Sequence, residues 1–262
     1  MGVLGSAGEG GAQMRGGSHG EFAVEVEGLT KSFGSFLAVD RVSFKVRLGE
    51  IFGFLCANGA GKTTTIRMLC GLLVPSGGRG HVAGYDIVRD FERIKSRIGY
   101  MSQKFSLYDD LSIRENLEFY GGIYRLSRRE TAARIEELFA AIGLAEHAGK
   151  LAGSLPVGWK QRMSLAAALL HDPDIIFLDE PTSGVDPVSR RGFWLLIYEL
   201  ADRGKTVFVT THYMDEAEYC SRISIMKLGR IVELANPHEL KRRYGAATMQ
   251  EVFLQAVKRE EL

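Results

Sequence analysis

The chain has 262 residues, of which 45% are hydrophobic and 25% charged, and its formal net charge is +1. These values are ordinary for a globular protein, and so small a net charge offers no electrostatic case for nucleic-acid binding. The 3 cysteines have no metal-ligand spacing and are too few for a disulfide framework. The length indicates one large domain or two closely joined ones.

The glycine-rich residues 1–20 hold almost nothing that could be buried. We therefore expect this tail to be disordered, and a folded domain over residues 21–262. No apolar run approaches the roughly 18 residues that a membrane-spanning helix needs. Any role at a membrane is expected to depend on a separate partner.

Predicted strands begin directly after the glycine-rich tail. The runs at 23–27 and 42–46 alternate apolar and polar residues, which is typical of half-buried strands. The run at 51–55 is almost wholly apolar, as expected for a central strand covered on both faces. Further strand-like runs, separated by helical patterns, follow at 98–101, 174–179, 205–211 and 222–228. This alternation predicts an α/β fold with a mostly parallel core sheet.

The stretch from about 104 to 170 has a different pattern. It contains helical periodicity and no convincing strand. The helices expected there are Ile113–Tyr124, Arg128–Ile142 and Gln161–His171. We interpret this stretch as a helical subdomain inserted into the α/β domain.

A glycine-rich turn joins the strand at 51–55 to a helix expected from Lys62 to about Leu72. Such a turn predicts a phosphate-binding loop, because successive backbone N–H groups and the helix N-terminus attract an anion. Lys62 is expected to reach the β- and γ-phosphates, and the Thr63 hydroxyl to bind Mg²⁺. The usual pattern opens with glycine, where this chain has Cys56. The loop reads Cys56-Ala57-Asn58-Gly59-Ala60-Gly61-Lys62-Thr63-Thr64.

Two adjacent carboxylates end the apolar run at 174–179. Parallel sheets bind ligands at the carboxyl ends of their strands. Asp179 is therefore expected to hold the Mg²⁺ shell, and Glu180 to orient or deprotonate the attacking water. A strand that ends in Asp-Glu is common by itself, so the carboxylates and the upstream loop support the prediction jointly.

With both motifs in place, the chain resembles the nucleotide-binding subunit of an ABC transporter, from about Phe22 to the C-terminus. The resemblance implies a P-loop NTPase core with an antiparallel N-terminal β subdomain. It also implies ATP and Mg²⁺ as cofactors and ATP hydrolysis coupled to transport. The residues implied to bind the nucleotide from the loop are Asn58, Gly59, Ala60, Gly61, Lys62, Thr63 and Thr64.

Several further residues receive roles from the resemblance. Gln103 matches the glutamine that touches Mg²⁺ and relays to the membrane domain, and His212 matches the switch histidine that contacts the γ-phosphate. Phe33 occupies the place where the family stacks an aromatic ring on adenine. Ser183-Gly184-Val185-Asp186 resembles the family's D-loop. Each would more often be a structural residue if it stood alone; their joint order favours the functional interpretation.

The family's signature motif, Leu-Ser-Gly-Gly-Gln, is altered in this chain. Pro156 removes a hydroxyl and a backbone donor, and Trp159 replaces the glutamine. Gly158 and the onset of the following helix persist, so helix amides could still face an anion. The alternative to such an anion-binding role is that Pro156 and Gly158 only form a structural turn before a helix. The altered form resembles multidrug and antibiotic exporters of the ABC-2 type. The aligned stretch is Leu155-Pro156-Val157-Gly158-Trp159-Lys160-Gln161-Arg162.

The resemblance also implies partners. Two nucleotide-binding subunits, as a homodimer or a heterodimer, would close each ATP between the loop of one subunit and Gly158 of the other. An integral-membrane permease encoded elsewhere would carry the substrate and hold this chain at the cytoplasmic face of the plasma membrane. No nucleic-acid partner is expected. The apolar run 105–108 is expected either at the permease contact or in the helical core.

Three other functions are alternatives to the transporter subunit. A soluble ABC-type ATPase of translation or repair usually carries two modules or long coiled coils, neither of which is visible here. A P-loop kinase or GTPase is disfavoured because no guanine-specificity motif occurs. A module that binds ATP without turnover is supported by Cys56 and Pro156 and opposed by Glu180 and His212.

Overall fold

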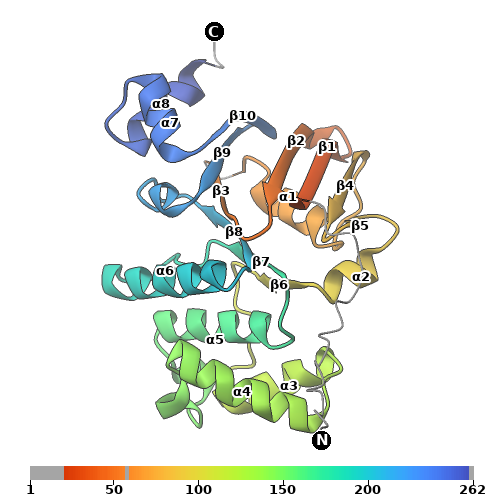
Figure 1. Cartoon of the computed structure of the whole chain (residues 1–262), viewed down its shortest axis with the longest axis vertical. Helices are drawn as coiled ribbons and strands as arrows, with labels where there is room; N and C mark the ends of the chain where they lie inside the picture. The colour runs from red at the N-terminus through yellow and green to blue at the C-terminus, as the bar shows by residue number, and fades with distance from the viewer. Residues whose placement is uncertain (1–20, 57–58, 260–262) are drawn as a thin grey trace, which may run out of the picture.

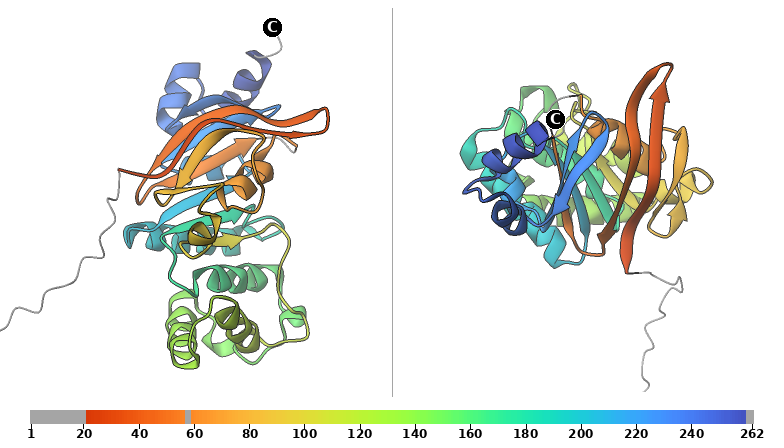
Figure 2. Two further views of the ribbon diagram at one scale, coloured as in Figure 1. Left: turned by 90° about the vertical axis from the view of Figure 1, so that its right-hand side faces the viewer. Right: turned by 90° about the horizontal axis from the view of Figure 1, so that it is seen from above.

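The computed structural model describes residues 21–56 and 59–259, apart from the side chains of Cys56 and Arg259. The disorder expected for residues 1–20 and the nucleotide contact expected of Asn58 lie outside the described residues. The described chain forms two sheets and a separate group of helices, and the antiparallel sheet and these helices lie at opposite sides of the core sheet (Figure 1, Figure 2).

The N-terminal sheet is antiparallel throughout, in the order β2-β1-β4-β5. β1 extends beyond the run at 23–27 because the pairing continues through register shifts between Val26 and Leu29, where Gly28 adopts a φ of 59°. β4 and β5 were not predicted. Glycine, arginine and histidine occupy every position of β4 except Val82, so the strand has little apolar alternation, and β5 has only two residues. The strands are β1 (Phe22–Phe33), β2 (Phe36–Arg47), β4 (Gly77–Val82) and β5 (Tyr85–Asp86).

The core sheet has the order β10-β9-β3-β8-β7-β6. Its strands are parallel except for β10, which forms an antiparallel hairpin with β9. The predicted mostly parallel core sheet is therefore confirmed. The strands are β3 (Ile51–Cys56), β6 (Ile98–Met101), β7 (Ile175–Asp179), β8 (Thr206–Thr211), β9 (Arg222–Lys227) and β10 (Arg230–Ala235).

Aromatic packing joins the two sheets. Phe44 of β2 stacks on Phe52 of β3, with 5.5 Å between the ring centroids. Phe54 and Phe208 complete the contact from β3 and β8, and all but Phe44 are completely buried. Such rings bury large apolar areas in edge or offset contacts, so this cluster fixes β3 and β8 beneath the antiparallel sheet.

Only helical elements and one isolated bridge lie between β6 and β7, a range described throughout. α3 and α4 each begin at a serine capping box, Ser112 with Glu115 and Ser127 with Glu130. α5 starts at Val157, four residues before the predicted Gln161, because Pro156 suits the position that precedes a first helical turn. The helices are α3 (Ile113–Ile123), α4 (Arg128–Ile142) and α5 (Val157–Leu169).

The remaining helices flank the two sheets. α1 ends at Leu69 rather than near Leu72, because Gly71 turns left-handed with a φ of 66°. Within the described residues, none of the helices combines the length and the apolar character needed to traverse a bilayer. The other helices are α1 (Lys62–Leu69), α2 (Phe91–Lys95), α6 (Pro187–Asp202), α7 (Pro237–Tyr244) and α8 (Met249–Arg259).

Candidate nucleotide-binding site

The loops that follow β3, β6, β7 and β8 meet at one edge of the core sheet and border a cavity of about 590 Å³. Nine of the residues predicted from the sequence line it, which are Gly59, Ala60, Gly61, Lys62, Thr63, Thr64, Gln103, Glu180 and His212. Carboxyl ends of neighbouring parallel strands share one edge, so the topology brings together motifs that lie up to about 150 residues apart in the chain.

The start of α1 requires glycine. Gly61 adopts a φ of 100°, and a Cβ built there would stand 2.5 Å from the Ala38 carbonyl oxygen. The helix therefore begins directly at Lys62, with β2 close behind it. The first N–H groups of a helix have no partners within it, so this turn can offer donors to an anion in the cavity.

Asp179 lies behind the cavity wall with 2% of its surface exposed. Its Oδ2 accepts a hydrogen bond of 3.0 Å from Thr63 Oγ1, and its Oδ1 accepts one of 2.6 Å from Thr210 Oγ1. The structure thus brings together Thr63 and Asp179, two of the residues predicted to hold a metal ion.

The Glu180 carboxylate contacts Lys62, Gln103 and His212, which were all predicted to act at the nucleotide. Its Oε1 lies 3.3 Å from Lys62 Nζ, and its Oε2 accepts a hydrogen bond of 3.0 Å from Gln103 Nε2. His212 Nδ1 lies 3.2 Å from the same Oε2, a close approach without hydrogen-bond geometry. Glu180 is only 9% exposed, so these electrostatic contacts are screened less than surface pairs.

The backbone of Glu180 is held in an uncommon conformation, with a φ of 51°. Its N–H donates a 2.9 Å hydrogen bond to Thr210 Oγ1. Thr210 pairs with Asp179 across β7 and β8, so one threonine hydroxyl holds both adjacent carboxylate residues. Thr210 could not be predicted from the sequence, because a threonine inside an apolar strand carries no sign of what its hydroxyl contacts.

The aromatic residue at the cavity differs from the one singled out in the sequence. Phe36 lines the cavity, whereas Phe33 does not, although the two are cross-strand neighbours at the end of β1 and the start of β2. Phe33 is 50% exposed, and Lys31 Nζ lies 5.2 Å from its ring centroid. Ala38 and Ser183 also line the cavity without having been predicted as ligands.

Gly158 stands apart from this cavity, in the first turn of α5. A Cβ there would lie 3.2 Å from Ser189 of α6, so close packing within the chain already favours glycine. Trp159, which replaces the signature glutamine, packs edge-on against His147 with centroids 4.2 Å apart. That residue therefore serves the packing of the helical group.

The thiol of Cys70 lies near the site but is not suited to chemistry. Burial raises the pKa of Cys70 well above its ordinary value, and the charge of Asp179 raises that pKa further. The thiol therefore stays protonated at neutral pH and packs as a small apolar group.

Comparisons with known proteins show which family the chain belongs to. The family model described as "ABC transporter" matches residues 39–183. Probable multidrug ABC transporter ATP-binding protein YbhF of Escherichia coli is 47% identical over 246 residues, covering 92% of this chain and 43% of that protein. The chain thus spans less than half the length of this curated relative. Daunorubicin resistance ATP-binding protein DrrA3 of Streptomyces coeruleorubidus is 37% identical over 235 residues, with 89% and 74% covered.

Solved structures show the same fold. An ATP-binding subunit of an ABC transporter superposes with a TM-score of 0.80 at 26% identity, covering 90% of this chain and 99% of that one. A dimeric ATP-binding cassette bound to ADP and Pi superposes with a TM-score of 0.73 at 27% identity, covering 81% and 98%. Family model, relatives and fold lead to one conclusion: this chain belongs to the ABC transporter family, among its ATP-binding proteins.

Proposed function

We propose that this chain is the ATP-binding and ATP-hydrolysing subunit of an ABC transporter that exports its substrate through a separate membrane permease. The observation that carries the proposal is the convergence of Lys62, Gln103 and His212 on Glu180, in the same cavity as the paired Thr63 and Asp179. The names of the relatives, which refer to multidrug handling and daunorubicin resistance, support export.

The phosphates of ATP would lie against the turn from Gly59 to Thr64, where Lys62 offers an ammonium group and α1 its first amides. Thr63 Oγ1 and Asp179 Oδ2 lie 3.0 Å apart and are hard oxygen ligands. This pair fits Mg²⁺, which usually binds one or two carboxylates together with substrate phosphates. Gln103 would add its amide oxygen. When bound, the ion would neutralise charge on the β- and γ-phosphates.

Glu180 would act on the water. It would accept a proton as the water oxygen bonds to the γ-phosphorus and the bond to the β-phosphate oxygen breaks, leaving ADP and phosphate. Gln103 and His212 contact Glu180 Oε2 and would hold the carboxylate in the direction of attack. His212, which is 37% exposed, is also free to approach the γ-phosphate from the cavity side.

Dimerisation would complete the site. Gly158 does not line the cavity of its own chain, and the first turn of α5 carries no side-chain cap. Its amides would face the γ-phosphate held by the partner subunit. The dimeric state of the solved ADP-bound and Pi-bound relative supports this arrangement. Closure by ATP and opening after hydrolysis would then follow from contacts to the γ-phosphate.

The proposed permease contact is a groove of about 480 Å³ between the core sheet and the helical group, whose lining includes Leu72 and Ile123. These two side chains are 48% and 55% exposed. Of the run 105–108, Phe105 and Tyr108 are exposed, whereas Leu107 packs against the core. A permease seated in this groove would hold the chain at the cytoplasmic face of the membrane.

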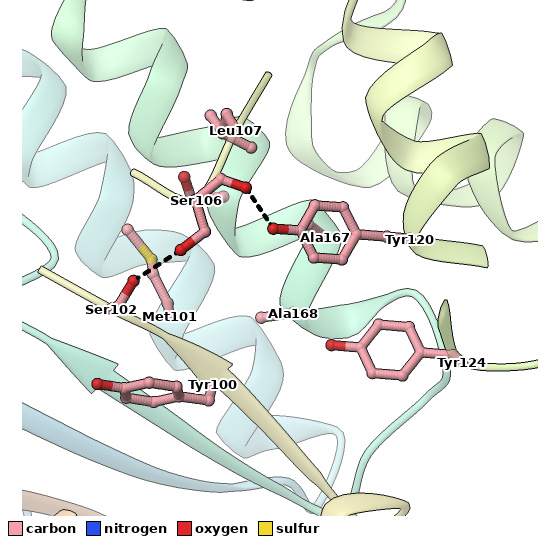
Figure 3. A pocket seen from close by; sticks show the side chains of 10 residues that line it. Tyr100, Met101, Ser102, Ser106, Leu107, Tyr120, Tyr124, Ala167 and Ala168 are labelled. Atoms are coloured by element: carbon pink, nitrogen blue, oxygen red, sulfur yellow. Dashed lines mark hydrogen bonds between the residues drawn. The ribbon is translucent and has the colours of Figure 1, made fainter. Parts of the chain in front are cut away.

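A second, smaller cavity lies beside this groove, and Tyr100 and Tyr124 line both. It measures about 30 Å³ and lies between β6, α3 and α5, directly behind the loop that carries Gln103. Figure 3 shows the Ser102 and Ser106 hydroxyls facing each other and the Tyr120 hydroxyl of α3 directed at the Ser106 carbonyl. The two serine oxygens are 3.2 Å apart, and Tyr120 donates a 2.5 Å hydrogen bond to that carbonyl. A load on α3 would thus be transmitted to the segment beside Gln103.

Two measurements test the proposal. Phosphate release from MgATP should be detectable and should be abolished in Lys62→Ala. Affinity capture of the full chain from detergent-solubilised membranes should recover a polytopic membrane protein. Turnover without such a partner would favour the alternative, a soluble ABC-type ATPase. The absence of turnover, with nucleotide still bound, would favour a regulatory module.

A further inference from the structure

One carboxylate outside the cavity is completely enclosed by protein. Glu216 opens the single-turn helix Glu216–Tyr219 that follows β8, and 0% of its surface is exposed. Carboxylates are almost never fully buried unless they are paired or hydrogen-bonded. The partners of Glu216 therefore indicate what it does.

Its two oxygens accept hydrogen bonds from two different segments of the chain. Thr182 Oγ1 donates to Glu216 Oε1 over 2.5 Å, and Thr211 Oγ1 donates to Oε2 over 2.6 Å. Both threonines are buried. Thr182 lies two residues after Glu180, and Thr211 directly precedes His212. The carboxylate therefore bridges the ends of β7 and β8 beside the two residues that meet at the cavity.

The bridge also holds the backbone on both sides of His212. Thr211 Oγ1, which donates to Glu216, accepts a 3.0 Å hydrogen bond from the N–H of Tyr213. In the described part of the chain, no hydrogen bond to Nδ1 fixes the His212 ring, whose centroid lies 4.2 Å from that of the Tyr213 ring. The direction in which His212 faces Glu180 therefore depends on its backbone, and through Thr211 on Glu216.

A cation from α6 completes the cluster. Arg190 Nε lies 3.6 Å from Glu216 Oε1, and the guanidinium lies 3.8 Å from the centroid of the Tyr213 ring. Arginine over an aromatic face is an attractive arrangement. The positive charge compensates the buried carboxylate and ties α6, which follows Asp186, to the segment around His212.

We propose that Glu216 is a positioning residue that sets the distance and direction between Glu180 and His212 by holding Thr182 and Thr211 together. It lines no part of the cavity and acts through these threonines. The inference rests on the proposed function, since the spacing matters only where Glu180 and His212 act in hydrolysis. Displacement of a reacting group by about 1 Å can lower a rate by about 10²-fold.

The first test removes one hydroxyl and keeps the side-chain shape. Thr211→Val should lower turnover at saturating MgATP at least about tenfold, because His212 loses its support, while the Kd for nucleotide stays unchanged. Thr206→Val is the matched control. Thr206 is equally buried at the opposite end of β8, where its hydroxyl accepts a 3.0 Å hydrogen bond from the Gly49 N–H. The control should lose similar thermal stability and keep its turnover; equal loss of turnover in both variants would overturn the proposal.

Glu216→Gln provides a second probe at the residue itself. The amide keeps the shape but offers one acceptor oxygen where the carboxylate offers two, so one of the two threonine contacts must change. The expected result is the same fall in kcat with unchanged nucleotide Kd. Normal kcat in a folded Glu216→Gln protein would show that the bridge does not position the site.

A double-mutant cycle separates this inference from the proposed function. Because Thr211 is argued to act through His212, Thr211→Val should cause no further loss in a His212→Ala background. Independent, multiplicative losses would contradict the positioning role. If His212→Ala itself turned over normally, the proposed function of that residue would fail. If His212→Ala lost turnover while Thr211→Val did not, only the present inference would fail.

Discussion

Lys62 Nζ and Glu180 Oε1 lie 3.3 Å apart, so the ammonium proposed to hold phosphate and the carboxylate proposed to activate water contact each other directly. Both side chains are more than nine-tenths buried. A bound γ-phosphate must therefore compete with Glu180 for the charge of Lys62. This competition links nucleotide affinity to the same residue that is proposed to drive turnover.

Replacing Glu180 with glutamine should separate binding from hydrolysis. The amide keeps the reach to Gln103 but removes the base, so turnover should fall by about 10²-fold or more. ATP binding should be retained or tightened, since the charge that competes for Lys62 is gone. Gel filtration with MgATP against ADP should show an accumulated dimer only with ATP. A Glu180→Gln protein that stays monomeric and hydrolyses ATP like wild type would move the base elsewhere, with His212 the next candidate.

Asp179→Asn is the matched control for that experiment. It removes the neighbouring charge that contacts Thr63 and Thr210. Because the proposed Mg²⁺ shell would be disturbed, MgATP itself should bind more weakly and no stable dimer should accumulate. Trapping of an ATP-bound dimer by Asp179→Asn would contradict the division of roles between the two carboxylates.

Lys62→Ala should abolish tight ATP binding, because the loop loses its ammonium and leaves Glu180 buried with weaker compensation. Lys205→Ala, which removes a lysine paired with Asp172 just before β8 and away from the cavity, should bind ATP normally. Equilibrium binding of a fluorescent ATP analogue would compare them. Wild-type affinity in Lys62→Ala would rule out the phosphate-binding assignment.

Glycine at position 158 has two explanations that an experiment can separate: contact with the partner's γ-phosphate and close packing against Ser189. Gly158→Ala should lose ATPase activity while nucleotide still binds to the monomer, because the Cβ obstructs the partner's γ-phosphate. The alternative is crowding against Ser189, which a Cβ would approach to 3.2 Å. Adding Ser189→Gly relieves the crowding alone. Restored ATPase activity in the double variant would make Gly158 a packing residue; continued inactivity supports the role in trans.

The aromatic contact to adenine is testable with two neighbouring residues. Stacking on a base contributes about 1–3 kcal/mol, so the alanine variant of the stacking residue should weaken ATP binding about tenfold and leave triphosphate binding unchanged. The resemblance assigns adenine stacking to Phe33, whereas Phe36 is the aromatic residue that lines the cavity. Isothermal titration of Phe33→Ala and Phe36→Ala with ATP would identify the ring. Normal affinity in both variants would exclude stacking by either.

Acid should destabilise the fold through His171. Burial lowers the pKa of His171 below its ordinary 6.5, against the opposing effect of its hydrogen bond to the Ile98 carbonyl. The unfolded chain therefore binds the proton first, and stability present above about pH 6.5 is lost as pH falls toward the folded-state pKa. The fall in Tm between pH 7.5 and 5.5 should be smaller in His171→Gln than in wild type. An equal fall in both would assign the acid sensitivity to other groups.

Elements with local signals could be predicted from the amino-acid sequence alone. Strand burial, left-handed turns and adjacent charges all depend on residues that are near one another in the chain. The sequence therefore predicts the apolar runs of β3 and β7, the glycine turn before Lys62 and the carboxylate pair Asp179–Glu180. These features were enough to predict the α/β fold and most of the cavity lining. The same local patterns did not predict β4, β5 and β10, and they placed the start of α5 too late.

The contacts between these residues depend on how the strands and helices pack in three dimensions. Parallel pairing of β7 with β8 sets Asp179 opposite Thr210, and burial of Glu216 joins Thr182 to Thr211. The pairing of β1 with β2 likewise leaves Phe36, and not Phe33, at the cavity. A hydroxyl or carboxylate has the same appearance in the chain whether it faces solvent or a distant strand. Its partner is chosen by sheet order and packing, which local sequence patterns do not encode.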